Sequence, residues 1–202
     1  MSETTLSHPY NREPVAFTQD ELGWLPWLEP YPADRLTERH WAGLVDASRA
    51  KSPYFMLLAH DPDILQARTR TDKDIFYNIA DGLPRPEREL AATAASRSNG
   101  CIFCASVHSR FASQFSKRRS DVQRLLDEGV SASIDPRWNA IIAASVALTA
   151  TPVAFGENEV GALRDAGLDD AEIVDVINSA PFFNWANRLM LSLGEPTKGT
   201  DA

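Results

Sequence analysis

The 202-residue chain contains 44% hydrophobic and 24% charged residues, the balance of a soluble globular protein with one sizeable core. Its 28 acidic side chains outnumber its 20 basic ones and give a net charge of −8, which argues against a nucleic-acid partner because phosphate binding requires a basic face. No apolar run approaches the roughly 20 residues of a membrane span, and no signal peptide is recognisable, so we expect a cytoplasmic protein with no membrane partner.

The first 32 residues are predicted to form an irregular arm, because five prolines interrupt any regular pattern there. Aromatic residues in this segment, such as Trp24 and Trp27, indicate that the arm packs on the body. We expect a helical domain over residues 33–195 and a short C-terminal tail over 196–202. The prolines of the arm are Pro9, Pro14, Pro26, Pro30 and Pro32.

After the arm, apolar residues recur at helical spacing in one segment after another. Pro86 at a first helical position, and Gly167 and Gly194 just beyond helix ends, are typical of helix boundaries. No segment alternates with period two for long enough to predict a strand, so the fold class is all-α. The expected helices cover residues 33–49, 54–76 with an interruption at 61–62, 86–97, 101–115, 122–127, 136–149, 158–166 and 169–193.

The only two cysteines of the chain, Cys101 and Cys104, fall within one helical turn of each other. Two cysteines cannot form the disulfide framework of a secreted protein, and CxxC spacing indicates either redox chemistry or part of a metal site. On a helix, Cys101, Cys104 and His108 lie within roughly 60° of arc, so one face carries two thiols and an imidazole. Residues three apart on a helix are about 5–6 Å from each other, within the range that a disulfide spans.

A thiol with a pKa of about 8.5 is mostly protonated at neutral pH and needs activation. The break at residues 98–100 predicts a helix N-terminus, whose dipole favours Cys101 as the more acidic thiol. His108, four residues after Cys104, instead favours Cys104, because it can accept or shuttle that thiol's proton. We favour Cys104 as the nucleophile, because a positioned base does more than a dipole screened by solvent.

A carboxylate that orients the imidazole of His108 would complete a proton relay. Glu89, on the preceding predicted helix, is the candidate. Its neighbour Glu87 is expected to be exposed to solvent.

The spacing of Glu89, Cys101, Cys104 and His108 resembles the E-x11-C-x2-C-x3-H pattern of alkylhydroperoxidase D-like proteins, which belong to the carboxymuconolactone decarboxylase superfamily. Residues 162–189 also resemble the peroxidase-related branch of that superfamily. The resemblance covers roughly residues 35–195. It implies an alkylhydroperoxidase D-like helical bundle, a homo-oligomer, and thiol-dependent reduction of a hydroperoxide without a metal or other cofactor.

The resemblance also implies the role of each residue. Cys104 attacks the peroxide and becomes a sulfenic acid, Cys101 resolves it to a disulfide, and Glu89 and His108 relay protons. An unidentified thiol or dithiol reductant then restores the dithiol. Many family members have a second imidazole between the two cysteines, where this chain has Phe103.

Other interpretations of the same residues remain open. A structural zinc site could use both cysteines and His108, but about 10.5 Å of helix rise separates Cys101 from His108, and no further histidine or cysteine is near in sequence. The cysteines could also be small buried apolar side chains. A lactone decarboxylase or hydrolase would not need two cysteines, and a non-catalytic oligomeric redox sensor or binding protein would keep the pair without turning over peroxide.

Overall fold

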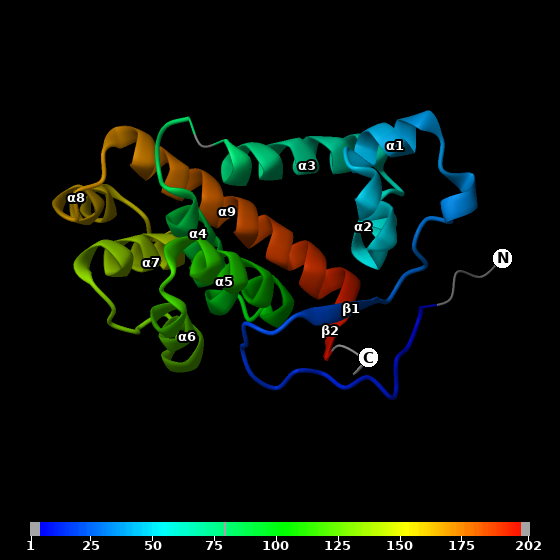
Figure 1. Ribbon diagram of the computed structural model, residues 1–202, viewed down its shortest axis with the longest axis horizontal. Helices are drawn as coiled ribbons and strands as arrows, with labels where there is room; N and C mark the ends of the chain where they lie inside the picture. The colour runs from blue at the N-terminus through cyan, green and yellow to red at the C-terminus, as the bar shows by residue number, and fades with distance from the viewer. Residues whose placement is uncertain (1–4, 79, 199–202) are drawn as a thin grey trace.

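The structure, a computed structural model, describes residues 5–78 and 80–198, so residues 1–4 of the expected arm and 199–202 of the expected tail lie outside the described residues. Within the described part the regular structure is helical apart from one small two-stranded sheet (Figure 1), which confirms the all-α prediction. None of the helices there is both long and apolar enough to cross a membrane. The α-helices are α1 (Glu38–Leu44), α2 (Pro53–Leu58), α3 (Pro62–Tyr77), α4 (Arg85–Ser98), α5 (Ile102–Ser116), α6 (Arg119–Glu128), α7 (Pro136–Thr149), α8 (Glu157–Asp165) and α9 (Asp170–Leu193).

The helix expected over residues 33–49 is broken into three short pieces. Two 3-10 turns, Ala33–Arg35 and Ala47–Lys51, flank α1. The chain leaves α1 through Val45, whose φ of 65° ends the helix. Asp46 then caps the second 3-10 turn by accepting a hydrogen bond from the Ser48 N–H at 2.9 Å.

One small sheet joins the arm to the end of α9. Strand β1 (Leu22–Pro26) pairs antiparallel with β2 (Gly194–Lys198), and Trp24 lies opposite Pro196. Gly194 is required here, because a Cβ at this position would lie 2.4 Å from the indole of Trp24. The sequence analysis missed both strands, since each has five residues and contains a proline. The pairing fixes the buried Trp24 over the body of the protein.

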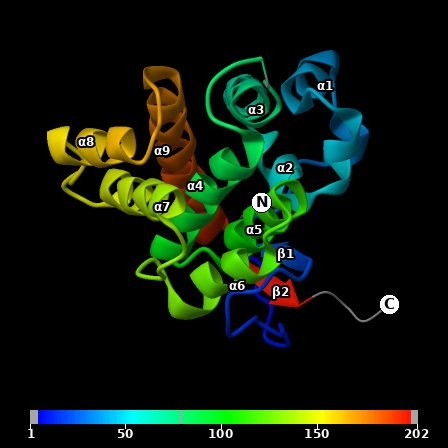
Figure 2. The same cartoon turned by 60° about the vertical axis from the view of Figure 1, so that its left-hand side comes forward.

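Helix α4 runs through the centre of the bundle and packs against α5, α7 and α9 (Figures 1 and 2). Small side chains on α4 let these neighbours approach closely. The hydroxyl groups of Thr93 and Ser96 each donate to the carbonyl four residues earlier, at 2.7 Å, so these buried polar groups are satisfied. The fully buried alanines of α4 are Ala91, Ala92, Ala94 and Ala95.

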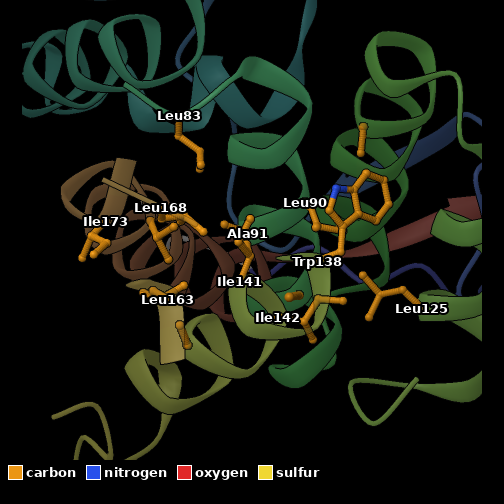
Figure 3. Packing of buried hydrophobic residues seen from close by; sticks show 14 of the residues in the cluster. Leu83, Leu90, Ala91, Leu125, Trp138, Ile141, Ile142, Leu163, Leu168 and Ile173 are labelled. Carbon is orange, nitrogen blue, oxygen red and sulfur yellow. The ribbon is translucent and has the colours of Figure 1, made fainter. Parts of the chain in front are cut away.

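The buried apolar residues form two main clusters on either side of α4. The first lies between α4, α6, α7, α8 and α9, and it contains Leu90, Trp138 and Ile141 (Figure 3). The second surrounds the two cysteines and is made by β1, α2, α3, α5 and α9. Its large members are Trp24, Tyr54, Leu57, Phe76, Phe182, Phe183 and Met190.

The loop between α3 and α4 is fastened by the buried side chain of Arg88. Its guanidinium donates to the backbone carbonyls of Ile75, Asn78 and Asp81, each at 2.8 Å. It also forms an ion pair with Asp175 on α9, with nitrogen and oxygen 2.9 Å apart. Arg88 therefore holds the C-terminal end of α3 against α4 and α9.

Candidate active site

The turn between α4 and α5 determines where the cysteines lie. Gly100 has a φ of +77°, in the left-handed region that favours glycine. The Cys101 N–H donates to the Ser96 carbonyl at 2.9 Å and the Gly100 N–H to the Arg97 carbonyl at 3.4 Å, the two hydrogen bonds of a Schellman motif. This motif ends α4 and turns the chain directly into α5.

Helix α5 begins one residue after Cys101, so its N-terminus is later than the sequence analysis expected. Ser98 is the last residue of α4, and Asn99 caps the C-terminus of that helix. Cys101 is the N-cap of α5, and Cys104 lies in its first turn. Both thiols are therefore at the positive end of the same helix, and the dipole does not distinguish them.

The two sulfur atoms are in direct contact beneath the surface. Cys101 Sγ and Cys104 Sγ lie 2.7 Å apart, and both cysteines are free. Only 2% of Cys101 and 5% of Cys104 is exposed. Closing a disulfide, with its bond of about 2.05 Å, requires only a small movement from this arrangement.

Glu89 on α4 faces His108 on the neighbouring helix α5. His108 Nδ1 lies 2.6 Å from Glu89 Oε2, and the carboxylate is almost completely buried. Arg85 donates from Nε to the other carboxylate oxygen at 3.2 Å. The imidazole is packed against Phe183, with ring centroids 3.9 Å apart, and against Phe76. A carboxylate that accepts a hydrogen bond from Nδ1 fixes the ring orientation and leaves the lone pair of the neutral imidazole on Nε2.

A cavity of about 510 Å³ opens beside this pair. Cys104, His108 and Glu89 all line it, whereas Cys101 is not among the lining residues in the part of the chain that the structure describes. Phe103 forms part of the apolar wall. A molecule in the cavity thus reaches Cys104, with Cys101 behind it.

Burial raises the pKa of the Cys104 thiol well above its ordinary value. The adjacent Cys101 thiol acts in the same direction, while the amide of Asn187 and the positive charge of Arg68 oppose it. This direction differs from the expectation that the helix N-terminus activates the thiol, because desolvation outweighs the dipole. The resting Cys104 is therefore a protonated thiol at neutral pH.

Asn187 on α9 joins that helix to the turn that carries the cysteines. It is fully buried, accepts a hydrogen bond from Asn99 Nδ2 at 3.0 Å and donates to Ser96 Oγ at 3.0 Å.

The expectation that Glu87 is exposed was wrong. Glu87 is 8% exposed and forms an ion pair with Arg137 on α7 at 2.8 Å, a partner that only the tertiary structure provides.

The sequence analysis missed two further residues of the cavity, Tyr54 on α2 and Arg68 on α3. Both are more than nine-tenths buried. Neither belongs to a motif, and each comes from a segment separate from the CxxC helix.

Among residues 5–78 and 80–198, no group of three or more His, Cys, Asp or Glu side chains is arranged to hold a metal ion.

Residues 62–147 match the model of the carboxymuconolactone decarboxylase family. The matched segment runs from the start of α3 nearly to the end of α7. It includes Glu89, Cys101, Cys104 and His108. No curated protein matches the sequence significantly.

Solved structures show the same fold. The alkylhydroperoxidase AhpD core of an uncharacterized peroxidase-related protein from Ralstonia eutropha JMP134 has a TM-score of 0.70 and 22% identity, over 96% of this chain and 95% of its own. A peroxidase-related protein from Silicibacter sp. TM1040 has a TM-score of 0.66 and 22% identity, over 95% of this chain and 96% of its own. The debrominase Bmp8 has a TM-score of 0.65 and 15% identity, over 81% and 88% of the two chains.

Proposed function

We propose that this protein, as a member of the superfamily of alkylhydroperoxidase D-like proteins and carboxymuconolactone decarboxylases whose family model matches residues 62–147, reduces a hydroperoxide with its own two thiols. The observation that carries the proposal is the arrangement at the cavity. Cys104 lines the cavity together with a His108–Glu89 pair, and the sulfur of Cys101 lies 2.7 Å behind that of Cys104. A nucleophile, a base with its orienting carboxylate, and a second thiol are the parts that this reaction requires.

In the first step, His108 Nε2 accepts the proton of Cys104, and the resulting thiolate attacks the terminal oxygen of the hydroperoxide. The O–O bond breaks, the sulfur is oxidised to a sulfenic acid, and the alkoxide leaves as an alcohol after it takes the proton from His108. The raised pKa of Cys104 makes this base necessary. Glu89 stabilises the imidazolium that forms for a moment between the two proton transfers.

In the second step, Cys101 attacks the sulfur of the sulfenic acid. An S–S bond forms, the S–O bond breaks, and the hydroxyl leaves as water with the proton of Cys101. One hydroperoxide and two thiols thus give one alcohol, one water and one disulfide. An external thiol or dithiol reductant then returns the pair to the dithiol by thiol–disulfide exchange.

The test is rapid mixing of the fully reduced protein with hydrogen peroxide and, separately, with cumene hydroperoxide. Mass spectrometry follows the loss of two hydrogens per chain, and peptide mapping locates the disulfide. We expect fast conversion to the Cys101–Cys104 disulfide. Oxidation at the rate of a free thiol, unchanged in His108→Ala, would refute the mechanism.

Two single cysteine variants separate the roles of the thiols. In Cys101→Ser the sulfenic acid should accumulate on Cys104 and be trapped by dimedone. In Cys104→Ser the fast phase should disappear. The reverse pattern would make Cys101 the nucleophile.

The same experiments address the alternatives. A redox sensor would form the disulfide once but would not consume peroxide continuously with a dithiol reductant. A lactone decarboxylase or hydrolase would keep its activity when both cysteines are replaced by serine. Homo-oligomerisation and a cytoplasmic location stay predictions.

A further inference from the structure

Arg68 carries a positive charge into the wall of the cavity without a partner for it. Its side chain is on α3, the residue is 7% exposed, and its Nε and Nη1 atoms are buried with no hydrogen-bond acceptor. No carboxylate of the described residues forms an ion pair with it. The guanidinium is surrounded by aromatic rings, with the centroids of Tyr54, Phe55 and Phe182 at 5.6, 5.7 and 5.4 Å.

An unpaired buried guanidinium is costly for the fold. A buried charge normally has a partner, because the desolvation penalty is not otherwise offset. Lysine or histidine could lose a proton to avoid this penalty, but arginine cannot. The arrangement therefore indicates that an anion supplied from outside the chain completes the site.

Two more buried donors without partners line the same cavity. They are the hydroxyl of Tyr54 and the indole Nε1 of Trp24, whose rings pack edge to face at 5.5 Å. Burial raises the pKa of Tyr54 to about 12, although the charge of Arg68 opposes this rise. Tyr54 therefore remains a hydrogen-bond donor at physiological pH.

The acidic residues of the cavity wall already have basic partners. Glu89 is bound by Arg85 and His108, Glu21 by Arg110 at 3.5 Å, and Asp72 by Arg49 at 4.0 Å. Lys51 is a further cation of the wall and is exposed. Of the buried charges that line the cavity in the described part of the chain, Arg68 is the one without a counter-ion.

We propose that Arg68, assisted by Tyr54 and Trp24, binds the carboxylate of the substrate and so directs its hydroperoxide group to Cys104. A planar carboxylate suits the fork of the guanidinium, and the several aromatic side chains of the wall suit an apolar hydrocarbon body. The volume of about 510 Å³ accommodates a small molecule. The substrate class is thus an apolar carboxylic acid that bears a hydroperoxide. The reaction part of this inference rests on the proposed function.

Binding is tested first, with probes that contain no peroxide. Calorimetry on the reduced full-length protein compares 3-phenylpropionate with 3-phenylpropionamide, which has nearly the same size but no charge. A lost charge-assisted hydrogen bond corresponds to a Kd about 10- to 100-fold weaker, so we expect this preference for the acid. Equal binding of acid and amide would overturn the proposal.

Two substitutions test the assignment to Arg68. Arg68→Met should remove the preference, while Lys51→Met, which deletes an exposed charge from the same wall, should retain it. Tyr54→Phe leaves the charge in place and should weaken binding of the acid only. A cooperative thermal transition of Arg68→Met shows that the variant is folded. The acid should raise the Tm of the wild type but not that of this variant. An unchanged preference in Arg68→Met would refute the site.

Kinetics then separate this inference from the proposed function. The two substrates compared are cumene hydroperoxide and its para-carboxylate derivative. Because the charge of Arg68 also lowers the pKa of Cys104, Arg68→Met should slow the reaction with both substrates. The carboxylate form should lose about 10-fold or more in kcat/KM beyond the loss seen with cumene hydroperoxide. An equal loss with both would assign Arg68 to the Cys104 thiolate and overturn the anion site. Acid binding without any peroxide reduction would instead refute the function and leave the anion site standing.

Discussion

His108 Nδ1 lies 2.6 Å from Glu89 Oε2, in a contact between α5 and α4 that is almost closed to water. Arg85 holds the second carboxylate oxygen, so the orientation of Glu89 is fixed from two sides. A neutral imidazole held in this way presents Nε2 as its proton acceptor. The pair thus has the geometry of an oriented base, and it lines the same cavity as the Cys104 thiol, which burial keeps protonated.

Replacement of Glu89 by glutamine should slow the oxidation of Cys104. The amide cannot stabilise an imidazolium, and it can select the wrong tautomer of His108. We expect the second-order rate constant with hydrogen peroxide to fall by about 10²- to 10⁴-fold, the usual contribution of a positioned acid or base. Stopped-flow fluorescence, together with mass-spectrometric detection of the disulfide, measures this rate constant.

Glu87→Gln is the matched control, because Glu87 is another buried glutamate of α4. Its partner is Arg137 on α7, and neither residue is among those that line the cavity. This variant should lose stability and keep its rate of thiol oxidation. A comparable loss of rate in both variants would mean that Glu89 acts only through the fold.

The pH dependence of Cys104 alkylation should reflect its raised pKa. Because burial disfavours the thiolate, little of it is present at pH 7, and the rate with iodoacetamide should rise with a midpoint above about 8.5, the value of a free thiol. Cys101→Ala removes the second cause of the rise and should move the midpoint of Cys104 downward. A midpoint in the wild type at or below that of a free thiol would contradict the burial argument.

Local signals in the sequence predicted much of this site. The break at Gly100 predicted that one helix ends and the next begins there. The sequence separations of Glu89 and His108 from the two cysteines indicated a proton relay between these two helices. The structure brings these four residues together, while their catalytic roles stay a prediction. What local spacing could not provide was the depth of burial, which reverses the expected direction of the Cys104 pKa.

Residues that depend on distant packing were not predictable in this way. Arg68 stands in the polar segment 68–73, a pattern that is typical of a solvated helix face. It is buried only because aromatic residues of α2 and α9 enclose it. The strands β1 and β2 pair only with each other, from opposite ends of the chain, so neither half carries a signal by itself.

Removal of the Arg88 guanidinium should strongly destabilise the protein. Arg88→Met removes the hydrogen bonds to the carbonyls of Ile75 at the end of α3 and of Asn78 and Asp81 in the loop, and it leaves the Asp175 carboxylate without its cation. Breaking a buried ion pair in this way costs about 3–5 kcal/mol, which urea unfolding measures. Arg39→Met, which removes an exposed ion pair with Asp63, should change the unfolding free energy little. Equal effects would show that the loop is not held by Arg88.

Asp135 should make the stability of the protein sensitive to acid. It is the N-cap of α7, where its side chain accepts hydrogen bonds from the Trp138 N–H at 3.0 Å and from Arg118 at 2.5 Å. Partial burial raises the pKa of Asp135, but these hydrogen bonds and the charge of Arg118 outweigh it, so the pKa is lowered. A lowered pKa means that the unfolded chain binds a proton more readily than the folded one.

The stabilisation from Asp135 is therefore complete above about pH 4, the ordinary range of an aspartate, and is lost as the pH falls through its lower value in the folded state. Asp135→Asn keeps a good N-cap but removes the titrating charge, so its unfolding free energy should fall less steeply than that of the wild type below about pH 4. Asp34→Asn, at an exposed aspartate, removes the same charge and should retain the wild-type slope. Urea titrations between pH 7 and pH 2.5 measure the three slopes. If the slope of Asp135→Asn matched that of the wild type, the bonds to Trp138 and Arg118 would not favour the ionised carboxylate.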